Sequence, residues 1–136
     1  MGSINHVATI VAGVAHFALG AGWYMLLSQA WLAAIGKTEA ELQGGRSPLP
    51  FVIAIAVSLI IAYTIAWLLP RLNAQTLAGG IRVGLFLALT LIATTLALNY
   101  GFEQRPVSLW LINAGYMIVG LALVGAIVGG WKRKAS

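Results

Sequence analysis

Two side chains in this sequence offer the most obvious chemistry: the carboxylate of Glu103 and the imidazole of His16. The chain has no Cys and no Asp, and Glu103 is one of only three acidic residues. A lone carboxylate can serve as an acid or base, and a lone imidazole can bind haem iron or pass a proton. Neither is accompanied by a nucleophile or a set of metal ligands, so we expect no enzyme, no metal site and no bound cofactor.

Glu103 belongs to a polar stretch, Asn99 to Tyr116, which lies between two apolar runs. Unpaired polar groups are costly in a bilayer, so we expect this stretch to gather at one membrane face. Glu103 and Arg105 should pair with each other or with groups on that face. Asn99, Asn113 and Tyr116 should turn inward beneath them. The predicted outer-face polar cluster comprises Trp23, Tyr24, Asn99, Tyr100, Glu103, Arg105, Asn113 and Tyr116.

Aromatic residues crowd the end of the first apolar run, at Trp23, Tyr24 and Trp31. Amphipathic rings at the end of a span are typical of an anchor at the headgroup level. Counting inward at 1.5 Å per residue places Tyr116 level with Gly20, whose missing side chain leaves room for a ring.

His16 lies near the middle of the first apolar run. Ser58 and Thr90 fall at a similar depth, so we predict that His16 hydrogen-bonds one of them; a proton relay or a ligand contact is the functional alternative. These three residues form the predicted mid-membrane polar group. His6 lies about 15 Å from His16 along a helix, so the two cannot hold one metal ion.

The composition is that of a membrane protein. Hydrophobic residues make up 60% of the chain and charged residues only 8%, against about a quarter charged in soluble domains. The net charge of +5 is spread over loops and a tail, which is typical of charges that set topology and contact anionic lipid. No basic face with base-reading side chains is evident, so we expect a lipid bilayer and no nucleic acid as partner.

We predict an all-α integral membrane bundle of four transmembrane helices in a single domain, residues 1–136, with short loops. The predicted spans are residues 6–27, 49–69, 77–100 and 108–130. Thr38 and Glu41 have the spacing of a capping box, and Gly44-Gly45 reads as a stop, which predicts one short interfacial helix after the first span. The loop 101–107 is short, so the last two spans should be antiparallel neighbours.

Glycines at intervals of four mark helix faces that permit close contact. Gly80 and Gly84 form one such pair, and Gly125 and Gly129 form another. We expect these faces to meet a partner or a second copy, in a homo-oligomer or a larger membrane complex. The predicted helix-packing residues are Gly20, Gly80, Gly84, Gly120, Gly125 and Gly129.

The distribution of basic residues predicts the topology. With four spans, one side of the membrane carries Arg71, Arg82, Lys132, Arg133 and Lys134, and the other carries Lys37, Arg46 and Arg105. The larger number favours the cytoplasm. We therefore predict that both termini are cytoplasmic and that the polar cluster lies at the outer face.

Three blocks of sequence carry a family resemblance. They are Gly20-x-x-Trp23-Tyr24 with Trp31 following, Asn99-Tyr100-x-Phe102-Glu103-x-Arg105-Pro106, and Leu111-Ile112-Asn113-Ala114-Gly115-Tyr116. On these blocks the chain resembles, over nearly its whole length, a family of small four-helix bacterial membrane proteins labelled as a domain of unknown function, number seventeen sixty-one. The resemblance implies four spanning helices in a bacterial inner membrane and implies no activity.

Three functions are compatible with this sequence. The first, which we predict, is an accessory or scaffold subunit that packs against a partner or a second copy. The second is a small-solute or proton-coupled transporter, for which His16 and the threonines qualify although no acidic residue lies inside a predicted span. The third is an enzyme or a cofactor or pigment carrier, with Glu103 as an acid or base or His16 as an axial haem ligand.

Overall fold

The computed structural model describes residues 4–44 and 47–131, which form helices joined by short loops. Four helical spans are long and apolar enough to cross a membrane: His6–Leu26, Leu49–Arg71, Leu77–Phe102 and Val107–Gly130. The chain is a multi-pass membrane protein, and the predicted all-α bundle of four spans is confirmed. Each observed span begins and ends within two residues of its predicted range.

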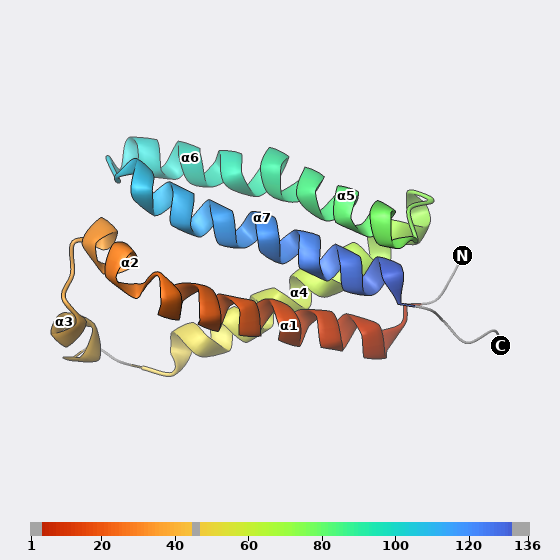
Figure 1. Ribbon diagram of the computed structural model, residues 1–136, viewed down its shortest axis with the longest axis horizontal. Coiled ribbons are helices and arrows are strands. Elements are labelled where there is room, and N and C mark those ends of the chain that lie inside the picture. The colour runs from red at the N-terminus through yellow and green to blue at the C-terminus, as the bar shows by residue number, and fades with distance from the viewer. Residues whose placement is uncertain (1–3, 45–46, 132–136) are drawn as a thin grey trace.

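The last span, α7 (Val107–Gly130), is the central helix of the bundle. It contacts α1 (His6–Leu26), α4 (Leu49–Arg71) and α5 (Leu77–Leu87). In Figure 1, α7 lies between α1 and the span that contains α5 and α6 (Ala93–Phe102). We call the end of the bundle with His6 and Gly130 the terminal face, and the end with the turn Glu103–Pro106 the loop face.

The contact between α5 and α7 is made by backbone rather than by side chains. A Cβ atom at Gly80 would clash with the carbonyl oxygen of Gly125, and one at Gly125 would clash with that of Gly80. The same holds for Gly84 against Leu121 and for Gly129 against Thr76. The two glycine pairs therefore face each other within one chain, and the expectation that they meet a partner or a second copy is wrong.

A π-helical turn, η1 (Ala88–Ile92), interrupts the third span between α5 and α6. Small buried residues follow α7 along this span at positions 80, 84, 88 and 93, so the last step is five residues rather than four. One extra residue in a turn rotates everything after it by about 100° relative to an uninterrupted α-helix. The turn thus keeps small residues against α7, and it changes which residues of α6 face the bundle.

Two short helices, rather than the one predicted, follow the first span. The chain bends at Leu27 and continues as α2 (Ser28–Ile35) and α3 (Glu39–Gly44). The predicted capping box begins α3, with reciprocal hydrogen bonds between Thr38 and Glu41 of 3.2 and 3.3 Å. The unpredicted helix α2 contacts α7 at the loop face, because its half-buried residues continue the apolar surface of α1 past the bend.

Candidate functional site

His16 is the polar side chain at the centre of the bundle, and it is 1% exposed. Its Nδ1 atom lies 2.8 Å from Ser58 Oγ on α4 and 2.9 Å from the Tyr116 hydroxyl on α7. The Tyr116 hydroxyl also donates to the backbone carbonyl of His16 over 2.9 Å. One residue of α1 therefore links three helices, and the contact with Ser58 is one of the two that the sequence predicts.

The other ring nitrogen of His16, Nε2, is buried and has no hydrogen-bond partner among the described residues. A Cβ atom at Gly120 would lie 2.8 Å from it, so the backbone of α7 packs against this edge of the ring. A buried N–H without an acceptor costs about 1–3 kcal/mol, and we therefore assign the proton to Nδ1. A proton relay needs partners on both nitrogens, and the described residues supply them on one only.

Tyr116 reaches His16 through a notch in α1 at Gly20. A Cβ atom at Gly20 would lie 2.8 Å from the Tyr116 hydroxyl oxygen and 2.9 Å from Cζ. The Tyr116 ring packs on the His16 ring with centroids 4.8 Å apart. The depth match between Gly20 and Tyr116, predicted from helix rise alone, is therefore present as a direct contact.

A second set of hydrogen bonds lies closer to the loop face. The Tyr24 hydroxyl donates to Asn113 Oδ1 over 2.6 Å, and Asn113 Nδ2 donates to the Tyr100 hydroxyl over 2.8 Å. Tyr24 also meets the Tyr116 ring edge-on at 5.7 Å and the Trp31 ring at 5.9 Å. These contacts join α1, α6 and α7, and they extend the aromatic packing from His16 to α2.

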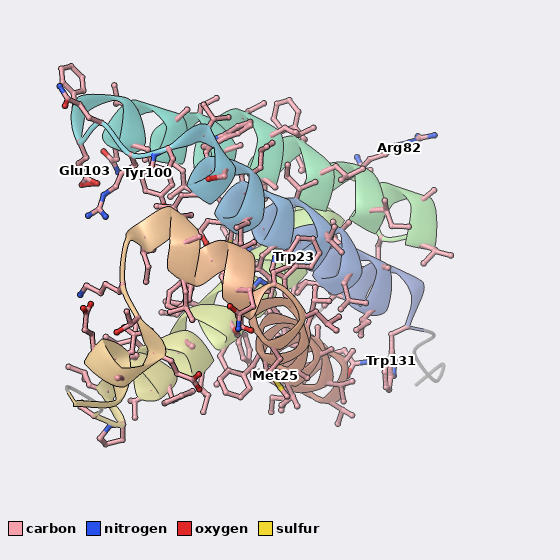
Figure 2. All side chains as sticks on the ribbon, turned by 60° about the vertical axis from the view of Figure 1, so that its left-hand side comes forward. Trp23, Met25, Arg82, Tyr100, Glu103 and Trp131 are labelled. Atoms are coloured by element: carbon pink, nitrogen blue, oxygen red, sulfur yellow. The ribbon has the colours of Figure 1, made fainter. Side chains whose placement is uncertain are left out.

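Trp23 faces α7 as well. Its indole Nε1 donates to the carbonyl of Ile112 over 2.9 Å, and Figure 2 shows Trp23 on the α7 side of α1. Trp23 and Tyr24 are each half-buried. Both rings direct their polar atoms to α7, and the anchoring of these rings at the headgroup level stays a prediction.

Glu103 and Arg105 lie at the loop face, where Figure 2 shows Glu103 beside the end of α6 that carries Tyr100. Arg105 Nε donates to Glu103 Oε2 over 3.3 Å. The side chain of Glu103 is 52% exposed and that of Arg105 is 46% exposed. This is the predicted pair, and it lies in the turn rather than within the buried network.

Two predicted site residues lie elsewhere. Asn99 is exposed, because the extra residue of η1 rotates α6 so that Tyr100, one position later, faces α7. Thr90 is also exposed, and its hydroxyl donates to the Phe86 carbonyl over 2.6 Å. It cannot reach His16, because it lies on the opposite side of the span from the buried Ala88.

Sequence reasoning missed two side chains that bond α7 to its neighbour. Trp110 Nε1 donates to the Ala93 carbonyl over 2.8 Å, just after the π-helical turn. Gln75 Nε2 donates to the Val128 carbonyl over 2.8 Å at the terminal face. Each is a hydrogen-bond donor near the end of an apolar run, and that position is the sequence feature that could have predicted a bond to the neighbouring helix.

The arrangement supplies hydrogen bonds between helices. His16 lies within the bundle, whereas Glu103 is in a solvent-exposed turn. In the part of the chain that the structure describes, no three His or acidic side chains are placed to hold a metal ion. What the geometry provides is a polar core that fixes how α1, α4 and α6 sit on α7.

Comparison with known proteins agrees with the sequence resemblance. A family model described as "Protein of unknown function (DUF1761)" matches residues 7–129, a range that contains all three resemblance blocks. Neither a curated protein nor a solved structure matches the chain. The comparisons therefore give a family and no activity.

Proposed function

The chain belongs to the DUF1761 family of proteins of unknown function, and from its own geometry we propose that it works as an accessory or scaffold subunit of a membrane complex. The observation that carries the proposal is the pairing of polar side chains across the spans. Ser58 and Tyr116 both bond His16, and Tyr24 and Tyr100 both bond Asn113. Polar side chains that hydrogen-bond across helices hold those helices in one arrangement.

A fixed shape is what a scaffold needs, because a partner then meets a surface that does not change. Interhelical hydrogen bonds contribute only about 0.6 kcal/mol each on average, so several are required to select one packing. Here they converge on α7 from α1 and α6. Since both glycine pairs are used within the chain, a partner subunit must contact the outward faces of the helices.

The direct test is purification from native membranes in a mild detergent, followed by intact-complex mass measurement. The proposal expects a mass larger than the 14.3 kDa chain by at least one further protein subunit. Tyr116→Phe should loosen the bundle and reduce recovery of that subunit, whereas the exposed-surface variant Gly101→Ala should not. A single chain carrying lipid alone, in every mild detergent used, would contradict the proposal.

One observation favours a second candidate, a small-solute or proton-coupled transporter. His16 is a titratable side chain that is buried at mid-span. Transport usually depends on polar groups at this depth. Flux measured with reconstituted wild-type protein and with His16→Gln separates the candidates, because a scaffold should give no flux in either case.

We also propose that the protein lies in a bacterial cytoplasmic membrane with its terminal face in the cytoplasm, as the basic-residue count favours. The chain has no Cys, so single cysteines can report the topology. Ser108→Cys, at the loop face, should react with an impermeant maleimide in intact cells. Leu72→Cys, at the terminal face, should react only after the membrane is opened, and the reverse pattern would refute the orientation.

A further inference from the structure

Arg82 is a charged side chain inside a membrane span. It lies on α5, five residues after Leu77, the first residue of the helix, which places its Cα about 7 Å from the helix start. No other charged residue lies between Leu77 and Phe102. Gly80 and Gly84, two positions to either side, pack on α7, so Arg82 projects from the opposite side of α5 and is exposed.

The acidic side chains of the sequence lie at the opposite end of the bundle from Arg82. The three acidic residues are Glu39 and Glu41, on α3, and Glu103, at the end of α6. All three lie at the loop face, whereas Arg82 lies near the terminal face (Figures 1 and 2). Within the described residues Arg82 makes neither a side-chain hydrogen bond nor an ion pair.

Arg71, at the same end of the bundle, is a contrasting arginine. Its guanidinium lies 3.8 Å from the centroid of the Trp67 ring and donates to the Trp67 carbonyl over 2.7 Å. Arg71 therefore has partners on its own helix. Arg82 has no such partner among the described residues, so its guanidinium is available to a group from outside the chain.

The direction of the Arg82 side chain indicates what that group is. Figure 2 shows it leaving α5 away from the bundle. In an α-helix the Cα–Cβ bond tilts toward the helix N-terminus, which for α5 is at Leu77, the end near the terminal face. A guanidinium that extends from within a span toward its near end reaches the level of the lipid headgroups. Ala78, one turn nearer that end on the same side of α5, is exposed and small, so it leaves this path open.

We propose that Arg82 binds the phosphate of an anionic phospholipid in the leaflet at the terminal face. The planar guanidinium matches two oxygens of a phosphate, and a phosphatidylglycerol headgroup, unlike phosphatidylcholine, carries no ammonium to compete for them. A carboxylate of a partner protein would demand an approach at the depth of the helix, whereas the side chain points toward the headgroups. The inference is independent of the proposed scaffold role.

The test is a lipid titration of the full chain in neutral detergent, read by native mass spectrometry. The probes are phosphatidylglycerol, phosphatidylcholine and inorganic phosphate, and the variants are Arg82→Gln, Arg82→Lys and the matched control Arg71→Gln. One basic residue near an anionic surface corresponds to about a fivefold change in affinity. Phosphatidylglycerol should therefore bind Arg82→Gln about fivefold more weakly than wild type, with Arg82→Lys between them and Arg71→Gln unchanged.

Each other result overturns the proposal. Equal losses in Arg82→Gln and Arg71→Gln would mean a general surface charge effect, and no loss in Arg82→Gln would mean that Arg82 does not hold the lipid. Competition by inorganic phosphate at equal concentration would mean a free-phosphate site. Unchanged lipid binding together with loss of a co-purifying subunit would assign Arg82 to an ion pair with a partner protein. Thermal unfolding in neutral detergent checks that the variants stay folded.

Discussion

The two sides of α7 use glycine for opposite purposes. On the α5 side, Gly80 and Gly125 bring two backbones into contact and leave no room between them. On the α1 side, Gly20 and Gly120 make room for the rings of Tyr116 and His16. The first contact is close and made by backbone, whereas the second is polar and made by side chains. Glycine therefore permits close backbone contact on one side of α7 and leaves room for an aromatic ring on the other.

Substitutions that disrupt the contact between α5 and α7 should cause the largest loss of stability. Gly125→Ala places a methyl group against the backbone of Gly80 and Ile81, which cannot move aside as a side chain can. Overpacking of this kind costs typically 1–3 kcal/mol, and for a backbone clash we expect about 3 kcal/mol or more. Unfolding in mixed micelles with increasing SDS measures the change. The control is Gly101→Ala, where a Cβ meets nothing within 4 Å, and equal unfolding midpoints for the two variants would contradict the contact.

Substitutions on the α1 side should cost less stability, and their cost should fall when the Tyr116 ring is removed. Gly20→Ala pushes a methyl group against the Tyr116 ring, and we expect a loss of about 1–3 kcal/mol. In a Tyr116→Leu background the ring is gone, so the same substitution should cost much less. A double-mutant cycle measures this difference. Gly22→Ala, at an open position on the same helix, is the control, and an equal cost of Gly20→Ala in both backgrounds would rule out the notch.

The hydrogen bonds on the α1 side should contribute less to stability than the fit of the Tyr116 ring against Gly20 does. Tyr116→Phe keeps the ring and removes the donor to the His16 carbonyl and the contact with Nδ1. At about 0.6 kcal/mol for an average interhelical bond, the expected loss is about 1 kcal/mol. Because Ser58 shares Nδ1 with Tyr116, Ser58→Ala should show coupling to Tyr116→Phe. Fully additive losses would mean that the three side chains do not act as one network.

The sequence predicts much of the α1 side and little of the α5 side. Helix rise alone places Tyr116 beside Gly20 and His16 near Ser58, because depth in a bilayer is a simple count of residues. The count fails for Asn99, since the extra residue in η1 leaves no mark in the apolar pattern. It also fails for the partners of the glycine faces. A small-residue face fits a helix of the same chain as well as one of another chain, and only the three-dimensional arrangement distinguishes them.

The smallest effect should come from the loop face, where the Glu103–Arg105 pair lies outside both contacts with α7. Its side chains are 52% and 46% exposed, and exposed ion pairs are worth about 0.2–1 kcal/mol before salt reduces them further. Glu103→Gln keeps the size of the side chain and removes the charge, so we expect a loss below about 0.5 kcal/mol at low salt. Because screening shortens to about 3 Å at 1 M salt, the difference from wild type should vanish there. SDS unfolding at low and at high salt measures both values, with Tyr116→Phe as the salt-independent comparison. A loss from Glu103→Gln that equals or exceeds that of Tyr116→Phe, and persists at high salt, would mean that the turn contributes more to stability than the network around His16 does.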